Sequence, residues 1–392
     1  MSLESGTYSK GLEGIIADET TICRLDGLHG KLYYRGYSIE DLARNADFEE
    51  VTYLLLYEKL PTAAELEQWR ARMRASRDIP IEVQIMIRTF PAKAHPMQLL
   101  QSVIAYLSVY IDHTIEHSHL CNCRDTLHQV VQMASVIATF HRFRMGKSYV
   151  QPSMTLSHGG NFLYMMRGRE PEEYEARIMD TCLVLHAEHE FNASTFTARV
   201  VASTMSTCYC SIAAAIGALF GSLHGGANER VLGMVEEIGT PDRVHEWMDR
   251  AIAEKRKVPG MGHREYKVKD PRSYIMEEFL KELSERKNDW RHYEVLKEVE
   301  KQFREKMEEK GKPLYPNVDF FSGAVYSLLG IPKILFTPIF AMARVSGWLA
   351  HILEQREHGN RIYRPESLYR GPQERAFVPL AQRDQTPPSA AR

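Results

Sequence analysis

Histidines stand beside other groups able to do acid–base chemistry in three short segments. His186 and His189 alternate with carboxylates in the run LHAEHEFNAST, where an apolar helical pattern ends. His224 lies between glycines in GSLHGGANE, and glycine lets backbone N–H groups approach a ligand closely. His263 ends a Pro-Gly-x-Gly loop in KVPGMGHREYK, with cations on both sides. That loop suits a phosphate-bearing ligand together with an acid–base group.

Each of these segments also has a purely structural interpretation. A histidine beside glycines is most often a cap or a core residue, and the pattern leaves open whether His224 and His263, 39 residues apart, share one active site. Asp319 is a lone carboxylate among apolar and aromatic residues in YPNVDFFSG. Desolvation there would raise its pKa from about 3.9 towards the range of a general base. The alternative, which the residues alone favour, is a helix N-cap.

The elements that must position these groups are predicted to be helices. Apolar residues recur at spacings of three and four in seven segments: 97–111, 127–140, 174–188, 245–255, 275–287, 293–310 and 334–355. Two β-prone runs, Thr20–Leu25 and Lys31–Tyr34, flank turn formers and predict one short hairpin near the N-terminus. Ser38 is a predicted N-cap, with Asp41 three residues later. The fold class is therefore all-α.

The composition changes along the chain in a way that indicates two domains. Residues 239–312 are rich in Lys, Glu and Arg, whereas 200–223 and 320–350 are largely apolar. A smaller, more solvated domain inserted into a larger apolar one would give this pattern. We predict a large domain of residues 1–224 and 326–392 and a smaller domain of residues 225–325. From Gly371 the chain is polar and contains proline, as in a tail.

Composition also excludes several classes of protein. Lys+Arg 49 against Asp+Glu 51 gives a net charge of −2, which argues against nucleic acid as the main partner. The start MSLESGTYSK lacks the apolar region of a secretory signal, and six cysteines are too few for a disulfide scaffold, so we expect a cytoplasmic protein. The uncharged run Val200–Leu223 could span a bilayer, but its Ser, Thr and Gly residues favour a buried helix or a subunit interface.

Six ordered motifs, the first of them in two parts, together resemble the citrate synthase family, in its short bacterial and archaeal type that includes 2-methylcitrate synthases. They are GLEGIIADETTIC, LYYRGYSIEDLA, HAEHEFNASTFTARV, GSLHGGANE, VPGMGHREYKVKDPR, NVDFFSG and ARVSGWLAHILEQ…RIYRP, within residues 11–372. The resemblance implies a two-domain helical fold whose smaller domain acts as a lid. It also implies condensation of acetyl-CoA with oxaloacetate, hydrolysis of citryl-CoA to citrate and CoA, and a homodimer or higher oligomer. Acetyl-CoA is a substrate, so neither a cofactor nor a metal is implied.

The resemblance further implies a role for individual residues. His224 would hydrogen-bond the thioester oxygen of acetyl-CoA as it enolises, His263 would polarise and protonate the oxaloacetate carbonyl, and Asp319 would remove the methyl proton. The implied oxaloacetate contacts are His189, Arg272, Arg344 and Arg364, the last reaching from the other subunit. The implied CoA contacts are the backbone of Val258, Pro259, Gly260 and Met261 for adenine, and Lys257, Arg264 and Lys267 for phosphates.

Physical chemistry agrees with these roles. The methyl proton of a thioester is a very weak acid, so a carboxylate removes it only if a donor stabilises the enolate oxygen, an effect typically worth about 3 kcal/mol. A neutral imidazole is the suitable donor. Arginine meets a carboxylate bidentately, which suits a dianion. Three arginines would leave the site positive, and from this we expect a protonatable His263 that acts as an acid.

Other functions remain as alternatives. His113, Glu116 and His117 form an H-x-x-E-H pattern, typical of some zinc hydrolases, and His119, Cys121 and Cys123 could add ligands, but no third-ligand motif stands out. A non-catalytic assembly protein is disfavoured because all seven residues with an implied catalytic or oxaloacetate role are intact. A 2-methylcitrate synthase using propionyl-CoA stays open, because one methyl group changes binding by only about 1–3 kcal/mol.

Overall fold

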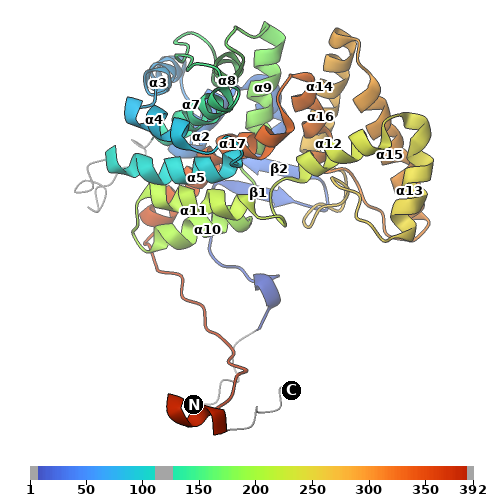
Figure 1. Ribbon diagram of the computed structural model, residues 1–392. Helices are drawn as coiled ribbons and strands as arrows, with labels where there is room; N and C mark the ends of the chain where they lie inside the picture. The colour runs from blue at the N-terminus through green and yellow to red at the C-terminus, as the bar shows by residue number, and fades with distance from the viewer. Residues whose placement is uncertain (1–7, 111–126, 386–392) are drawn as a thin grey trace. The chain divides into compact units, whose positions relative to one another are not determined.

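The computed structural model describes residues 8–110 and 127–385, and these are mainly helical (Figure 1). The α-helices are α1 (Ile39–Asn45), α2 (Phe48–Tyr57), α3 (Ala63–Ala75), α4 (Ile81–Thr89), α5 (Pro96–Leu107), α7 (Leu127–Arg144), α8 (His158–Arg167), α9 (Glu173–His186), α10 (Ala193–Ser203), α11 (Cys208–Phe220), α12 (Ala227–Ile238), α13 (Val244–Ala253), α14 (Pro271–Lys287), α15 (Arg291–Glu308), α16 (Asp319–Leu328) and α17 (Phe336–Glu357). The 3₁₀ helices are η1 (Lys10–Leu12), η2 (Ser108–Tyr110), η4 (Pro241–Arg243), η5 (Lys333–Leu335) and η6 (Leu380–Gln385). The predicted all-α class is confirmed.

The predicted hairpin is also present. Strand β1 (Cys23–Asp26) pairs antiparallel with β2 (Lys31–Tyr34), and a third strand that we did not predict, β3 (Tyr37–Ser38), pairs with β2. Ser38 Oγ accepts a hydrogen bond from the Asp41 backbone N–H at 3.1 Å, which confirms the predicted N-cap of α1.

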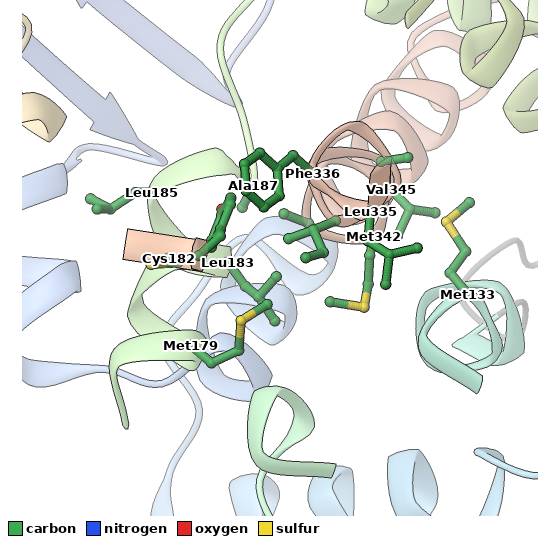
Figure 2. Close-up of a cluster of buried hydrophobic side chains, with 14 of the residues drawn as sticks. Met133, Met179, Cys182, Leu183, Leu185, Ala187, Leu335, Phe336, Met342 and Val345 are labelled. Carbon is green, nitrogen blue, oxygen red and sulfur yellow. The ribbon is translucent and has the colours of Figure 1, made fainter. Parts of the chain in front are cut away.

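Helix α17 is the central element of the apolar core. It packs against α2, α7, α9, α10 and α11. Figure 2 shows Met133 of α7 and Met179 and Leu183 of α9 in the same buried cluster as Met342 and Val345 of α17. Among the described residues, one helical stretch, Lys333–Glu357, is long and apolar enough to cross a membrane, and 89% of its most apolar window is buried inside the structure. The apolarity of this stretch therefore serves the core.

The uncharged run 200–223 is not the single buried helix that we expected. It contains the end of α10, a break at residues 204–207, and α11. The Thr207 hydroxyl starts the second helix by accepting a hydrogen bond from the Cys210 N–H at 3.1 Å. The two helices pack on each other, and both contact α17. A hydroxyl side chain competing for backbone hydrogen bonds explains the break.

Helices α12 to α16, drawn at the right of Figure 1, pack mainly on one another. Helices α12 to α15 lie inside the predicted smaller domain and α16 extends three residues beyond it, to Leu328. The limits of 225 and 325 stay a prediction. The chain forms two compact units, one ending at Arg361 and one beginning at Ile362. Within the second unit, the Tyr369 hydroxyl donates to the Pro372 carbonyl at 2.9 Å.

Candidate active site

His224 lies in the turn that follows α11, where its backbone N–H donates to the Gly221 carbonyl at 2.9 Å. Its Nε2 accepts a hydrogen bond from the Ser194 backbone N–H at 3.2 Å and lies 2.9 Å from Ser194 Oγ. Because a backbone N–H can only donate, Nε2 holds the lone pair and Nδ1 carries the proton. Burial, helped by Arg344, lowers the pKa of His224 to about 4. The ring is therefore a neutral donor through Nδ1, the form that enolate stabilisation requires.

His263 has the opposite tautomer. Its Nδ1 accepts from the backbone N–H groups of Glu265 at 3.0 Å and Tyr266 at 3.3 Å, so the proton lies on Nε2. Burial, and then the positive charge of Arg272, lower its pKa to about 4. The positive charge that we expected to favour a protonatable His263 instead lowers its pKa, since a nearby cation disfavours a second positive charge. The role of His263 as an acid stays a prediction. The ring is a neutral Nε2–H donor.

Asp319 is the first residue of α16. The cap is provided by Asn317, whose Oδ1 accepts from the Asp319 N–H at 3.0 Å and whose Nδ2 donates to the Gly262 carbonyl at 2.9 Å. The interpretation of Asp319 as an N-cap is therefore excluded, and its carboxylate is left for chemistry. Burial raises its pKa to about 6, against the opposing charge of Arg272. The predicted direction of the shift is confirmed.

Arg272 is already paired inside the protein. Asp270 accepts from its Nε at 3.0 Å and from its Nη2 at 2.7 Å, and both side chains are buried. Although burial raises the pKa of Asp270, the charge and hydrogen bonds of Arg272 hold it below its usual range. The Nη1 of Arg272 donates a long hydrogen bond, of 3.5 Å, to the Leu185 carbonyl. We did not foresee Asp270, and it makes the site less positive than three arginines alone would.

Several buried polar atoms in this region have no hydrogen-bond partner within the described chain, and two of them belong to cavity-lining side chains with a predicted role. Arg344 donates through Nε to the His186 carbonyl at 2.8 Å, while its Nη2 is unpaired. The Nε2 atom of His189 is also unpaired, and its ring centroid lies 5.2 Å from that of His263. Unpaired buried polar atoms are costly, so these two fit a ligand that supplies polar or anionic groups.

One cavity of about 900 Å³ brings the predicted residues together. Its lining includes six of the seven predicted catalytic and oxaloacetate residues: His189, His224, His263, Arg272, Asp319 and Arg344. Arg364 belongs to the second unit, and its role stays a prediction. We missed three contributors: the N-terminal segment 11–17, Asn317, and Ser194, whose Oγ also accepts from Trp348 Nε1 at 3.2 Å. Ser194 and Asn317 lie inside motifs whose histidines and aspartate drew attention first, whereas segment 11–17 lies in a motif without a candidate chemical group.

The predicted CoA residues are less well defined. Arg264 lines the cavity, 3.8 Å from Glu13, and Lys267 Nζ donates to the Arg264 carbonyl at 3.0 Å. In the Val258–Met261 segment, the carbonyls of Val258 and Gly260 already accept backbone hydrogen bonds from Met261 and Asn317. Lys257 is exposed and Pro259 is half-buried. The CoA assignment for all seven residues stays a prediction.

The candidate zinc residues His113, Glu116 and His117, with His119, Cys121 and Cys123, lie outside the described residues. Within residues 8–110 and 127–385, no group of three or more His, Cys, Asp or Glu side chains could hold a metal ion. The zinc hydrolase alternative gains no support from the described residues.

Comparison with known proteins identifies close relatives. The family model described as "Citrate synthase, C-terminal domain" matches residues 11–366. A citrate synthase of Synechocystis sp. is 42% identical over 98% of this chain and 96% of its own length, and 2-methylcitrate synthase 1 of Corynebacterium glutamicum is 38% identical over 95% and 98%. Citrate synthase from Pyrobaculum aerophilum superposes with a TM-score of 0.89 at 42% identity, covering 95% and 94% of the two chains. The Thermoplasma acidophilum enzyme in ternary complex with carboxymethyl coenzyme A and oxaloacetate gives 0.88 at 34% identity, covering 96% and 99%.

Proposed function

Because the chain belongs to the citrate synthase family, and is thus an acyltransferase of that type, we propose that it condenses acetyl-CoA with oxaloacetate and hydrolyses citryl-CoA to citrate and CoA. The observation that carries this proposal is the convergence of a carboxylate of raised pKa and two neutral histidines of opposite tautomer on one cavity. Paired groups whose environments set different protonation states are typical of acid–base catalysis.

The enolisation step needs a base and a donor at the same time. Asp319 takes the methyl proton, because its raised pKa makes it a stronger base than an exposed aspartate. His224 donates from Nδ1 to the thioester oxygen, where negative charge develops. Ser194 fixes this tautomer from the far side of the ring, so no reorganisation is needed when the charge appears.

The second step, condensation, needs the ketone of oxaloacetate to be held in place and polarised as the electrophile. His263 donates its Nε2–H to the ketone oxygen of oxaloacetate. The unpaired atoms of Arg344 and His189 bind the polar groups of the same substrate. Arg272 is partly neutralised by Asp270, so a dianion calls for one more cation. We assign that cation to Arg364 of the partner subunit in a homodimer. The helices of residues 225–325 would close over the cavity and exclude water before condensation.

Thiol release measured with purified protein tests this function. With oxaloacetate present, acetyl-CoA should release CoA, and kcat/KM should exceed that for propionyl-CoA. A preference for propionyl-CoA would make the protein a 2-methylcitrate synthase instead. This is the second candidate function, because the Corynebacterium relative carries that name. No thiol release with either thioester would contradict the proposal. We expect the enzyme to work in the cytoplasm, in line with its few cysteines.

A further inference from the structure

The turn of the N-terminal hairpin packs directly on the loop that carries His263. The backbone N–H of Lys267 donates to the Gly27 carbonyl at 2.8 Å. A Cβ atom added to Gly27 would lie 2.2 Å from the Glu265 carbonyl oxygen, 2.8 Å from its carbonyl carbon and 3.4 Å from the Tyr266 nitrogen. The peptide joining Glu265 to Tyr266 therefore rests on the bare Cα of Gly27, with no space for a side chain.

That same peptide holds the tautomer of His263. Its N–H, on Tyr266, donates to His263 Nδ1 at 3.3 Å, and the preceding N–H of Glu265 donates at 3.0 Å. A peptide group is a rigid plane, so a displaced Glu265 carbonyl carries the Tyr266 N–H with it. Without these two donors, either ring nitrogen of His263 could hold the proton. The proposed polarisation of oxaloacetate requires it on Nε2.

The turn makes a second contact with the loop and is itself held together. Gly30 has a φ of +62°, and a Cβ there would lie 2.7 Å from Val268 Cγ2. Asp26 closes the turn by accepting from the His29 N–H at 3.0 Å and contacting His29 Nδ1 at 2.8 Å. On its other side, the loop is bonded to the segment before Asp319, through Gly262 N–H to Tyr315 and Asn317 N–H to Gly260. The loop is thus held between the hairpin turn and the approach to the proposed base.

We propose that the hairpin turn Asp26–Gly30 is a positioning element for catalysis, which keeps the proton of His263 on Nε2 by supporting the Glu265–Tyr266 peptide. The turn lines no part of the cavity and acts through its contacts with the loop that follows His263, chiefly through this peptide. The inference rests on the proposed function in one respect only, the role of His263 towards oxaloacetate. The tautomer itself is a property of the free protein and can be measured without activity.

Gly27→Ala tests the proposal, with Gly233→Ala as the matched control, because a Cβ at Gly233 in α12 meets nothing within 4 Å. In protein labelled with ¹⁵N-histidine, the His263 signals, assigned from their loss in His263→Gln, should change from the Nε2–H pattern to a mixture of tautomers in Gly27→Ala. The kcat should fall at least about tenfold. The infrared carbonyl stretch of bound oxaloacetate should move towards its free value. Gly233→Ala should leave all three readouts unchanged.

Asp26→Ala provides a second variant should Gly27→Ala fail to fold. It removes the contacts of an exposed carboxylate with His29, which loosens the turn without adding bulk. It should shift the same nitrogen signals in the same direction, with a smaller fall in kcat. Unchanged His263 signals in a folded variant would overturn the inference, whether or not activity falls, because loss of activity alone would reflect general loosening. A wild-type protein that releases no thiol would instead overturn the proposed function, while the nitrogen signals would still decide on the positioning role.

Discussion

At the scale of single residues, the site depends on the protonation of three side chains in one cavity: two neutral histidines and one ionised aspartate. Burial lowers the pKa values of His224 and His263 to about 4, so both rings are neutral at physiological pH. Burial raises the pKa of Asp319 to about 6, so it is ionised at neutral pH yet more basic than an exposed aspartate. The same desolvation acts with opposite sign on acids and bases, and this gives two neutral donors beside one charged base.

Asp319→Asn should abolish proton abstraction while oxaloacetate still binds. The amide keeps the shape of the carboxylate but cannot accept a proton, so we expect kcat to fall by at least about 10²-fold. Oxaloacetate affinity, measured by calorimetry, should change little, because this dianion is bound by arginines and histidine. Retention of more than about a tenth of the wild-type kcat would show that another group is the base.

The pH dependence of kcat/KM should have an acid limb governed by Asp319. A base works only when deprotonated, so activity should be present above its pKa and fall as the pH drops through about 6. His224 and His263 stay neutral down to about pH 4, so they should add no limb between pH 5 and 8. A profile that is flat between pH 5 and 7, measured at constant ionic strength, would contradict the assigned pKa.

At the scale of elements, the site is assembled where helices begin and loops meet. Asn317 starts α16 by accepting from the Asp319 N–H and also holds the loop of His263 by donating to Gly262. One side chain therefore joins the proposed base to the loop of the proposed electrophilic donor. The hairpin turn supports that loop from the opposite side, so short elements from distant parts of the sequence set its position.

Asn317→Ala should reduce both stability and activity. Loss of the cap should lower the unfolding free energy by about 1 kcal/mol, and a displaced base and loop should lower kcat by about 10- to 100-fold. Asn317→Ser is the matched control, because its hydroxyl can still accept from Asp319 but cannot reach the Gly262 carbonyl as the amide does. Urea unfolding should show recovery of stability in this variant, while kcat stays low. Equal kcat in Asn317→Ser and wild type would exclude a role for the bond to Gly262.

At the scale of the whole molecule, we expect each subunit to complete the site of its partner through Arg364. Take Arg364→Ala and His263→Ala, each inactive alone, and refold them together in equal amounts. In a mixed dimer one site carries both lesions and the other carries neither. Random pairing makes about half of the dimers mixed, so activity should recover to about a quarter of that of the wild type. Inactive mixtures, with subunit exchange verified by native mass spectrometry, would mean that Arg364 serves its own chain.

The sequence by itself determined the helical class, the hairpin and the cap at Ser38, because periodicity and capping are local properties. The residues that meet in the cavity were predicted from the resemblance of their motifs to the citrate synthase family, and residue type alone left their convergence open. Tertiary structure alone decided how those residues are protonated and paired. Ser194 sets the tautomer of His224, the loop after His263 sets the opposite one, and the extent to which Asp270 offsets Arg272 depends on their common burial. The hairpin turn that supports this loop lies 240 residues away in the chain. Desolvation and hydrogen bonding depend on neighbours in space, so they cannot be predicted from the order of residue types along the chain.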